Sequence, residues 1–193
     1  MQTGTRLALI RHAPALHGGA MAGRRDVAAD VSHAAQIAGL RARLQDLGAS
    51  RVVTSPALRC VQTARALWPE HSGFAEDARL WEQDFGAWEG VPFIDLPDLG
   101  PLSSAELAAH RPPGGESFVE LCARVTPALE DLAHDAGCVA VVAHAGVIRA
   151  ALALALEAQA TALRFEVAPL SLTEIVSLPG LGWSIAGVNR VAQ

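Results

Sequence analysis

Lysine and tyrosine are both absent from the 193 residues, so all 15 basic residues are arginine. Walker-type phosphate loops, Schiff-base enzymes and pyridoxal enzymes all need a lysine, and the sequence therefore excludes these three classes. Charged residues are also scarce at 18%, whereas hydrophobic residues make up 51% of the chain. This balance excludes a disordered chain and predicts a globule with a sizeable core.

Cysteine is scarce as well, and the three present, Cys60, Cys122 and Cys138, are an odd number without C-x-x-C spacing. Each lies in an apolar stretch, which favours buried free thiols and a reducing, cytoplasmic compartment. Long hydrophobic runs are missing: the run near the N-terminus has four residues, and the segment 150–156 is too short to cross a bilayer. We therefore expect an untargeted, soluble protein with no membrane partner.

Basic charge is in deficit, because 15 arginines face 20 aspartates and glutamates and give a net charge of −5. A broad nucleic-acid surface needs a basic face that releases phosphate counterions, so nucleic acid is not expected as a partner. A phosphate group could still bind at a local cluster of arginines.

Short buried strands alternate with helical patterns along most of the chain. Strands are predicted at 6–11, 51–54 and 138–143, and helices at 32–47 with Ser32 as N-cap, at 57–68, at 117–135, and from His144 to about residue 157. Further strands are predicted at 163–168, 172–178 and 183–188, the last two joined by a hairpin turn at Pro179-Gly180. This order predicts a single α/β domain over residues 1–193, in three layers, with helices on both faces of a mostly parallel central sheet.

The alternation weakens between residues 74 and 113, where five prolines interrupt the chain and one short helix is expected at 103–110. We predict that this segment is a small excursion that forms a lid over the active site.

Polar residues follow three of the predicted strands, at the position where open α/β sheets bind their ligands. Arg11-His12 ends the first strand, Arg59 stands in the first turn of the helix after the second, and His144 ends the strand at 138–143. Arginine forks suit phosphate oxygens, and the pattern indicates an anion beside imidazoles. Each residue alone has a structural alternative, namely a buried strand-end histidine or, for Arg59, a solvated helix arginine.

Three carboxylates in the segment LWEQDFGAWEG, Glu82, Asp84 and Glu89, are candidates for a general acid, and a solvated acidic loop is the alternative. The residues alone do not choose among them. No metal site is expected, because His12 and His17 lie in a glycine-rich loop without a Cys-His cluster or an H-E-x-x-H helix.

Five segments together resemble the histidine phosphatase superfamily. They are RHAP at 11–14, SPALRCVQTA at 55–64, LWEQDFGAWEG at 80–90, PPGGES at 112–117 and VVAHAGVIRA at 141–150. They are similar, in family order, to the first histidine signature, the second arginine motif, the acid loop, a further family segment and the second histidine motif.

The resemblance implies that His12 is the nucleophile, that Arg11, Arg59 and His144 bind the phosphoryl oxygens around it, and that Glu82 donates the leaving-group proton. It implies a phosphoric monoester hydrolase that acts on a small phosphorylated metabolite through a phosphohistidine, with no metal or other cofactor. The RHAP form, the brief insert and the C-terminal tail look most similar to the alpha-ribazole phosphatase branch, so alpha-ribazole 5'-phosphate of cobalamin biosynthesis is the expected substrate.

Other functions remain open at this point. Pro14 and Gly18 replace the glutamate and asparagine usual in phosphoglycerate mutases, which disfavours a mutase-like enzyme, while a broad-specificity sugar-phosphate phosphatase shares all the motifs. A non-catalytic phospho-ligand binding module would keep the arginine pocket, but the intact His12, Glu82 and His144 argue against it. The oligomeric state is left open, with a homodimer as one candidate.

Overall fold

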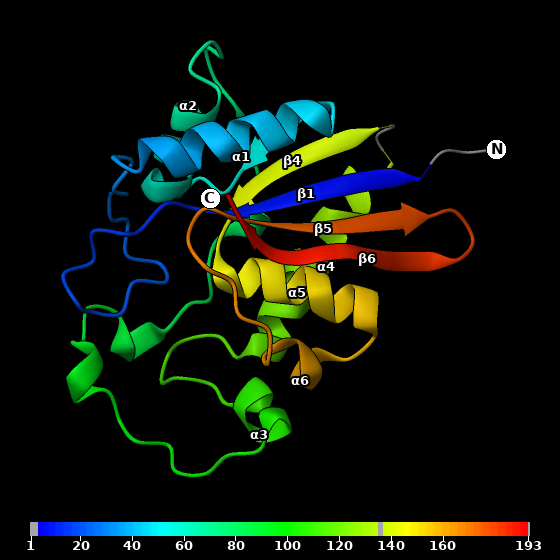
Figure 1. The fold of residues 1–193 in the computed structure, drawn as a ribbon. Coiled ribbons are helices and arrows are strands. Elements are labelled where there is room, and N and C mark those ends of the chain that lie inside the picture. Colours follow the sequence, from blue (N-terminus) through cyan, green and yellow to red (C-terminus); the bar gives the residue numbers. More distant parts are fainter. Residues whose placement is uncertain (1–3, 135–136, 193) are drawn as a thin grey trace.

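The computed structural model describes residues 4–134 and 137–192, and its strands form one sheet in the order β3-β2-β4-β1-β5-β6 (Figure 1). The strands are β1 (Thr5–Arg11), β2 (Ala49–Thr54), β3 (Ala75–Glu76), β4 (Cys138–Ala143), β5 (Ser171–Leu178) and β6 (Gly182–Val191). Strands β3, β2, β4 and β1 run parallel, whereas β5 is antiparallel to both β1 and β6. The predicted α/β class with a mostly parallel sheet is confirmed.

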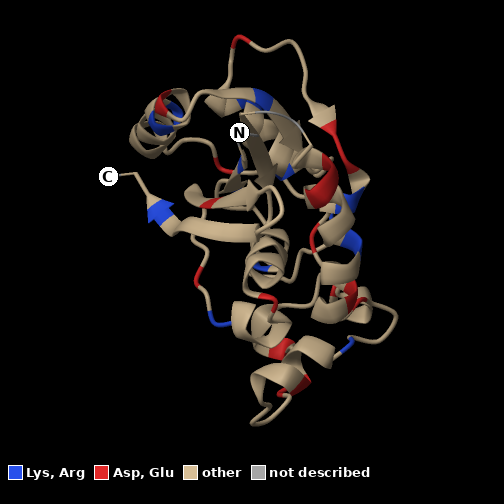
Figure 2. Cartoon of the chain, turned by 90° about the vertical axis from the view of Figure 1, so that its right-hand side faces the viewer, with Lys and Arg blue, Asp and Glu red and all other residues tan. Residues whose placement is uncertain are grey.

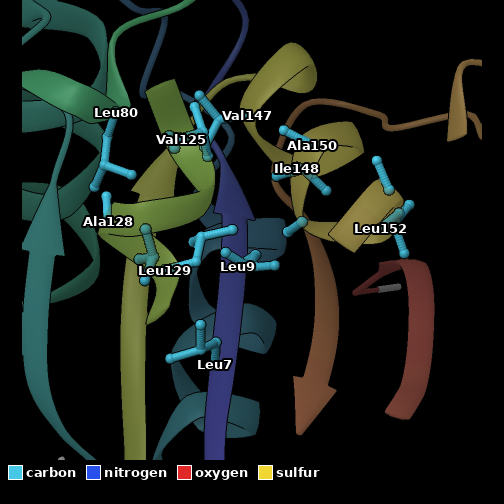
Figure 3. Close-up of a cluster of buried hydrophobic side chains, with 14 of the residues drawn as sticks. Leu7, Leu9, Leu80, Val125, Ala128, Leu129, Val147, Ile148, Ala150 and Leu152 are labelled. Carbon is cyan, nitrogen blue, oxygen red and sulfur yellow. The ribbon is translucent and has the colours of Figure 1, made fainter. Parts of the chain in front are cut away.

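Helices cover both faces of this sheet, because alternate residues of each buried strand point to opposite sides. On one face, Leu7 and Leu9 of β1 pack with α4 (Phe118–Leu132) and α5 (Ala145–Leu156), as Figure 3 shows. On the other face, Ala8 and Ile10 pack with α1 (Ala34–Asp46) and α2 (Leu58–Leu67). The sheet is thus the middle of three layers.

Local capping explains where the helices begin. Helices α3 (Ser104–Ala109) and α4 each start with a capping box, in which Ser103 and Ser117 exchange hydrogen bonds with the glutamates three residues later. Pro127 lies inside α4 without ending it. The expected N-cap Ser32 is wrong: α1 follows His33, whose side chain makes no capping bond.

The strand predicted at 163–168 is also wrong. This segment follows the short helix α6 (Gln159–Ala162) and is a loop, since β5 takes the sheet position beside β1. The loop is fixed through bonds that a strand would not make: Asn189 Oδ1 accepts from the Ala168 amide at 2.7 Å, and Leu170 N–H donates to the Arg11 carbonyl at 3.1 Å. Its buried Val167 belongs to the same core cluster as Leu7 and Leu9 of β1.

The proline-rich segment after β3 contains α3 and single-turn 3-10 helices at Ala78–Leu80, Gly86–Trp88 and Phe93–Asp95. Backbone pairs join it to the loop after β1, among them an antiparallel bridge between Ala20 and Pro92. Charged residues of both signs are interspersed over the chain (Figure 2). Among the described residues, no helix has the length and apolar character that crossing a membrane requires.

Candidate active site

The carboxyl ends of β1, β2 and β4 meet at one edge of the sheet. His12 N–H continues the β1 ladder to the Ala143 carbonyl at 3.0 Å, and Ser55 N–H donates to the Val142 carbonyl at 2.9 Å. Because the three strands are parallel neighbours, the residues that follow them, His12, Ser55 and His144, come together.

His12 is a neutral imidazole with a defined tautomer. Its side chain is buried, and Nδ1 lies 2.7 Å from the Ala13 carbonyl, an acceptor, so Nδ1 carries the hydrogen and Nε2 the lone pair. Burial lowers the pKa of His12 to about 3, and the cations Arg59 and Arg11 act in the same direction. His12 therefore presents an unprotonated nitrogen throughout the neutral pH range.

His144 lies behind His12, with ring centroids 5.2 Å apart in an edge-to-face arrangement. It is fully buried, and burial, followed by the neighbouring His12 and Arg59, lowers its pKa well below the usual value. The Arg59 Nε–H donates to its Nδ1 at 3.3 Å, so the ring hydrogen is on Nε2, 2.9 Å from the Ser55 hydroxyl oxygen. Both ring nitrogens of His144 are thus engaged.

Arg59 is buried with 1% of its surface exposed, so the alternative of a solvated helix arginine is wrong. Besides His144, its guanidinium donates from Nη1 to the Arg25 carbonyl at 3.0 Å and from Nη2 to the Gly23 carbonyl at 2.7 Å. Each of these nitrogens carries a second hydrogen that can serve a ligand.

Arg11 contributes the second guanidinium. Its Nη1 donates to the Val167 carbonyl at 2.5 Å, and its buried Nε has no hydrogen-bond partner among the described residues. Burial lowers the pKa of Arg11, an effect that Glu82 opposes and Arg149 and Arg59 reinforce. A buried donor left unpaired is costly, and the charge of this guanidinium favours an anion in the adjacent pocket.

The structure distinguishes the three candidate carboxylates of the acid loop by their hydrogen-bond partners, which the sequence does not reveal. Glu82 lines the pocket, where its oxygens accept from the Gln83 amide at 2.9 Å and the Gly146 amide at 3.2 Å. Asp84 instead accepts from the Gly86 amide and closes a local turn. Glu89 accepts from three successive amides, those of residues 23, 24 and 25, and orders that loop.

Sequence reasoning missed the pair that holds the acid loop. Arg124 donates to the Arg79 carbonyl at 2.6 Å, the Trp81 carbonyl at 3.0 Å and the Glu82 carbonyl at 3.3 Å. The same guanidinium binds both carboxylate oxygens of Glu116, at 2.9 and 2.8 Å. A sequence signal existed, because Arg124 stands on the buried side of α4 close to Leu121 and Ala128, where an arginine needs partners.

A pocket of about 160 Å³ opens above these groups. It is lined by Arg11, His12, Ala15, His17, Met21, Ala22, Arg59, Glu82, Phe85 and Phe93. Four of the five expected site residues therefore line one cavity. His144 is connected to it through its hydrogen bond with Arg59. Within residues 4–134 and 137–192, no group of three His, Cys, Asp or Glu side chains is arranged to hold a metal ion.

Solved structures share this fold over nearly the whole chain. A mycobacterial glucosyl-3-phosphoglycerate phosphatase superposes with a TM-score of 0.83 at 25% identity, covering 97% of this chain and 99% of that one. An Escherichia coli protein named for alpha-ribazole-5'-P phosphatase activity gives a TM-score of 0.81 at 23% identity, covering 96% of each chain. At this identity, the second likeness shows the fold alone.

Curated relatives match a shorter stretch. A bifunctional protein of Mycobacterium tuberculosis is 34% identical over 142 residues, which is 66% of this chain and 37% of that protein. A 6-phosphofructo-2-kinase/fructose-2,6-bisphosphatase of Caenorhabditis elegans is 33% identical over 108 residues, 53% of this chain and 23% of that protein. The chain thus spans well under half the length of these relatives.

The family model described as histidine phosphatase superfamily (branch 1) matches residues 7–190, which include all the strand-end residues of the pocket. With a match over nearly the entire chain, and with the expected sheet beneath it, the protein belongs to the histidine phosphatase superfamily.

Proposed function

We propose that this chain is a phosphatase that hydrolyses a small phosphomonoester through a covalent phosphohistidine on His12. The observation that carries the proposal is the free lone pair of His12 Nε2 in a pocket that also holds the guanidinium groups of Arg11 and Arg59. Family membership supports it, as does the name of the mycobacterial phosphatase that shares the fold.

The first step forms a bond between His12 Nε2 and phosphorus while the bond from phosphorus to the ester oxygen breaks. Phosphoryl transfer spreads negative charge over the equatorial oxygens, which fixed cations stabilise. Arg11 offers the charge of its guanidinium, and Arg59 offers the second hydrogens of Nη1 and Nη2.

We assign His144 to the same phosphoryl-binding set. In the present arrangement its Nε2–H points to the Ser55 hydroxyl, 2.9 Å away. A phosphoryl oxygen can receive that hydrogen only if it replaces Ser55 as the acceptor. Before such an exchange, His144 contributes by holding Arg59 through the Nε contact.

Glu82 completes the cycle as acid and then base. Its carboxyl gives a proton to the departing alcohol oxygen, and the resulting carboxylate takes a proton from the water that attacks phosphorus. The second step breaks the bond between phosphorus and nitrogen, releases inorganic phosphate and restores His12. Glu82 regains its proton in the second step, and neither step is assigned to a metal ion.

For the substrate, we propose alpha-ribazole 5'-phosphate, with a cobalamin-related role, on the resemblance of the RHAP motif and the C-terminal tail. A sugar-phosphate phosphatase of broad specificity is the runner-up, since it would use the same residues. A cytoplasmic location belongs to the same proposal, because Cys60, Cys122 and Cys138 are buried and unpaired.

Trapping the intermediate tests the mechanism. The enzyme would be mixed with ³²P-labelled substrate and quenched rapidly in alkali, where phosphohistidine survives. We expect an acid-labile label on the wild-type protein and on the control His71→Ala, whose histidine lies outside the pocket, but none on His12→Ala. Turnover by His12→Ala near the wild-type rate would eliminate the covalent mechanism.

The same preparation separates a phosphatase from a binding module. A module would gain thermal stability from inorganic phosphate yet release no nitrophenol from p-nitrophenyl phosphate. Turnover should persist after exhaustive EDTA treatment. Loss of activity that added Mg²⁺ or Zn²⁺ restores would contradict the metal-independent mechanism.

A further inference from the structure

Two chemically different sets of side chains line the pocket. Arg11, His12, Arg59 and Glu82 form the phosphoryl end, and the rest of the lining is apolar apart from one histidine. This part of the lining consists of Ala15, His17, Met21, Ala22, Phe85 and Phe93. We infer that it is a leaving-group subsite for an uncharged alcohol that carries a flat apolar or aromatic group, an inference that rests on the proposed phosphatase activity.

Among the described residues, the subsite has no cation that could bind a second anionic group of the substrate. Among the described residues that line the pocket, the guanidinium cations are Arg11 and Arg59, and both belong to the phosphoryl end. Arg24, which is close in sequence, does not line it and places its guanidinium 5.7 Å from the centre of the Trp81 ring. A carboxylate or second phosphate entering this region would lose water without gaining a cation.

His17 supplies the polar side chain of the subsite. Its Nδ1 accepts from the Gly19 amide at 3.1 Å, so the hydrogen of the neutral ring is on Nε2. The ring also meets the Phe93 ring edge to face, with centroids 5.1 Å apart. One donor in an apolar wall can serve a single hydroxyl or ring nitrogen of the alcohol.

Phe93 is held in place and yet is half exposed, with 48% of its surface accessible. Its amide donates to the Gly19 carbonyl at 2.9 Å, and the adjacent Pro92 forms the bridge to Ala20, so the ring is presented by a fixed backbone. Leu16 and Ile94 beside this subsite in sequence are also exposed, at 61% and 90%. Exposed apolar surface of this kind contributes little to stability and suits contact with a ligand ring.

Paired substrates test the inference. Benzyl phosphate and 4-carboxybenzyl phosphate release alcohols of similar acidity, so a difference in kcat/KM reports recognition of the added carboxylate rather than chemistry. We expect benzyl phosphate to be preferred by about tenfold or more, because each tenfold corresponds to only about 1.4 kcal/mol. Glycerol phosphate, uncharged in its alcohol part but lacking a flat group, should fall well below benzyl phosphate.

Variants assign the preference to named residues. Met21→Arg should raise kcat/KM for 4-carboxybenzyl phosphate, and Phe93→Ala, at an exposed position, should lower it for benzyl phosphate while sparing the glycerol ester. Leu16→Ala, outside the pocket lining, is the matched control and should keep the wild-type ratio. Equal use of the two benzyl esters by the wild type would overturn the inference, whereas hydrolysis of no ester at all would instead refute the proposed function.

Discussion

Mild acid should destabilise this protein through His12. Burial lowers the pKa of His12 to about 3 in the folded chain, whereas an unfolded histidine has its ordinary value near 6.5. Between these values the unfolded chain binds a proton that the folded chain does not, so unfolding becomes more favourable as the pH falls. The free energy of unfolding therefore has its full value, as far as His12 is concerned, above about pH 6.5, and it falls progressively as the pH drops toward 3.

The expected loss is large enough to measure. At pH 5, about 1.5 pH units below the unfolded value, the proton taken up on unfolding by His12 lowers the free energy of unfolding by about 2 kcal/mol relative to pH 8. The total free energy of unfolding of a typical domain is about 5 to 15 kcal/mol. Burial lowers the pKa of His144 too, so this second histidine adds to the loss in the same direction.

Urea unfolding at pH 8 and pH 5 measures the effect. His12→Asn can keep the hydrogen bond to the Ala13 carbonyl without titrating, so its free energy of unfolding should fall by about 2 kcal/mol less than that of the wild type between the two pH values. His134→Asn, at an exposed histidine, is the control and should follow the wild type. An unchanged pH dependence in His12→Asn would refute the assignment of a low pKa to His12.

Further substitutions test the acid loop and the phosphate site. A Cβ at Gly146 would overlap the Glu82 carboxylate and approach Leu121 Cδ2 to 2.8 Å, so Gly146→Ala should reduce kcat for alkyl phosphates more than for p-nitrophenyl phosphate, as Glu82→Gln should. Arg124→Gln should show the same leaving-group dependence, and equal losses on both substrates would contradict its positioning role. Arg59→Ala should lower kcat/KM by about 10² to 10³; unchanged turnover and unchanged phosphate affinity would make Arg59 purely structural.

The sheet could be predicted where burial is continuous. All six residues of β4 are buried. An unbroken apolar run of that length, in an α/β domain, is typical of a central strand covered on both faces. The segment 163–168 shows the limit of that reasoning. Its apolar residues belong to a loop, and backbone amides of this loop donate hydrogen bonds to Asn189 and Arg11. Local periodicity does not encode these contacts.

The candidate site divides in the same way. Residues that directly follow strands, such as His12 and His144, are predictable because the strand ends bring them to one edge. The helical pattern indicates that Arg124 needs partners, but spacing does not identify the partners of Arg124 or Glu89. These partners lie far along the chain, at the carbonyls of residues 79, 81 and 82 and at the amides of residues 23–25. Whether the segment 74–113 moves as a lid stays a prediction.

Two side chains hold the backbone of the loop at residues 23–25 by hydrogen bonds. Glu89 accepts from its amides, and Arg59 donates to the carbonyls of Gly23 and Arg25. Releasing this loop would break both sets of bonds at once, so its opening is a cooperative event rather than local fraying. Its amides should therefore exchange with solvent deuterium far more slowly than those of an ordinary surface loop. Phosphate bound to Arg59 should slow that exchange further, which would make a backbone segment outside the pocket a reporter of occupancy within it.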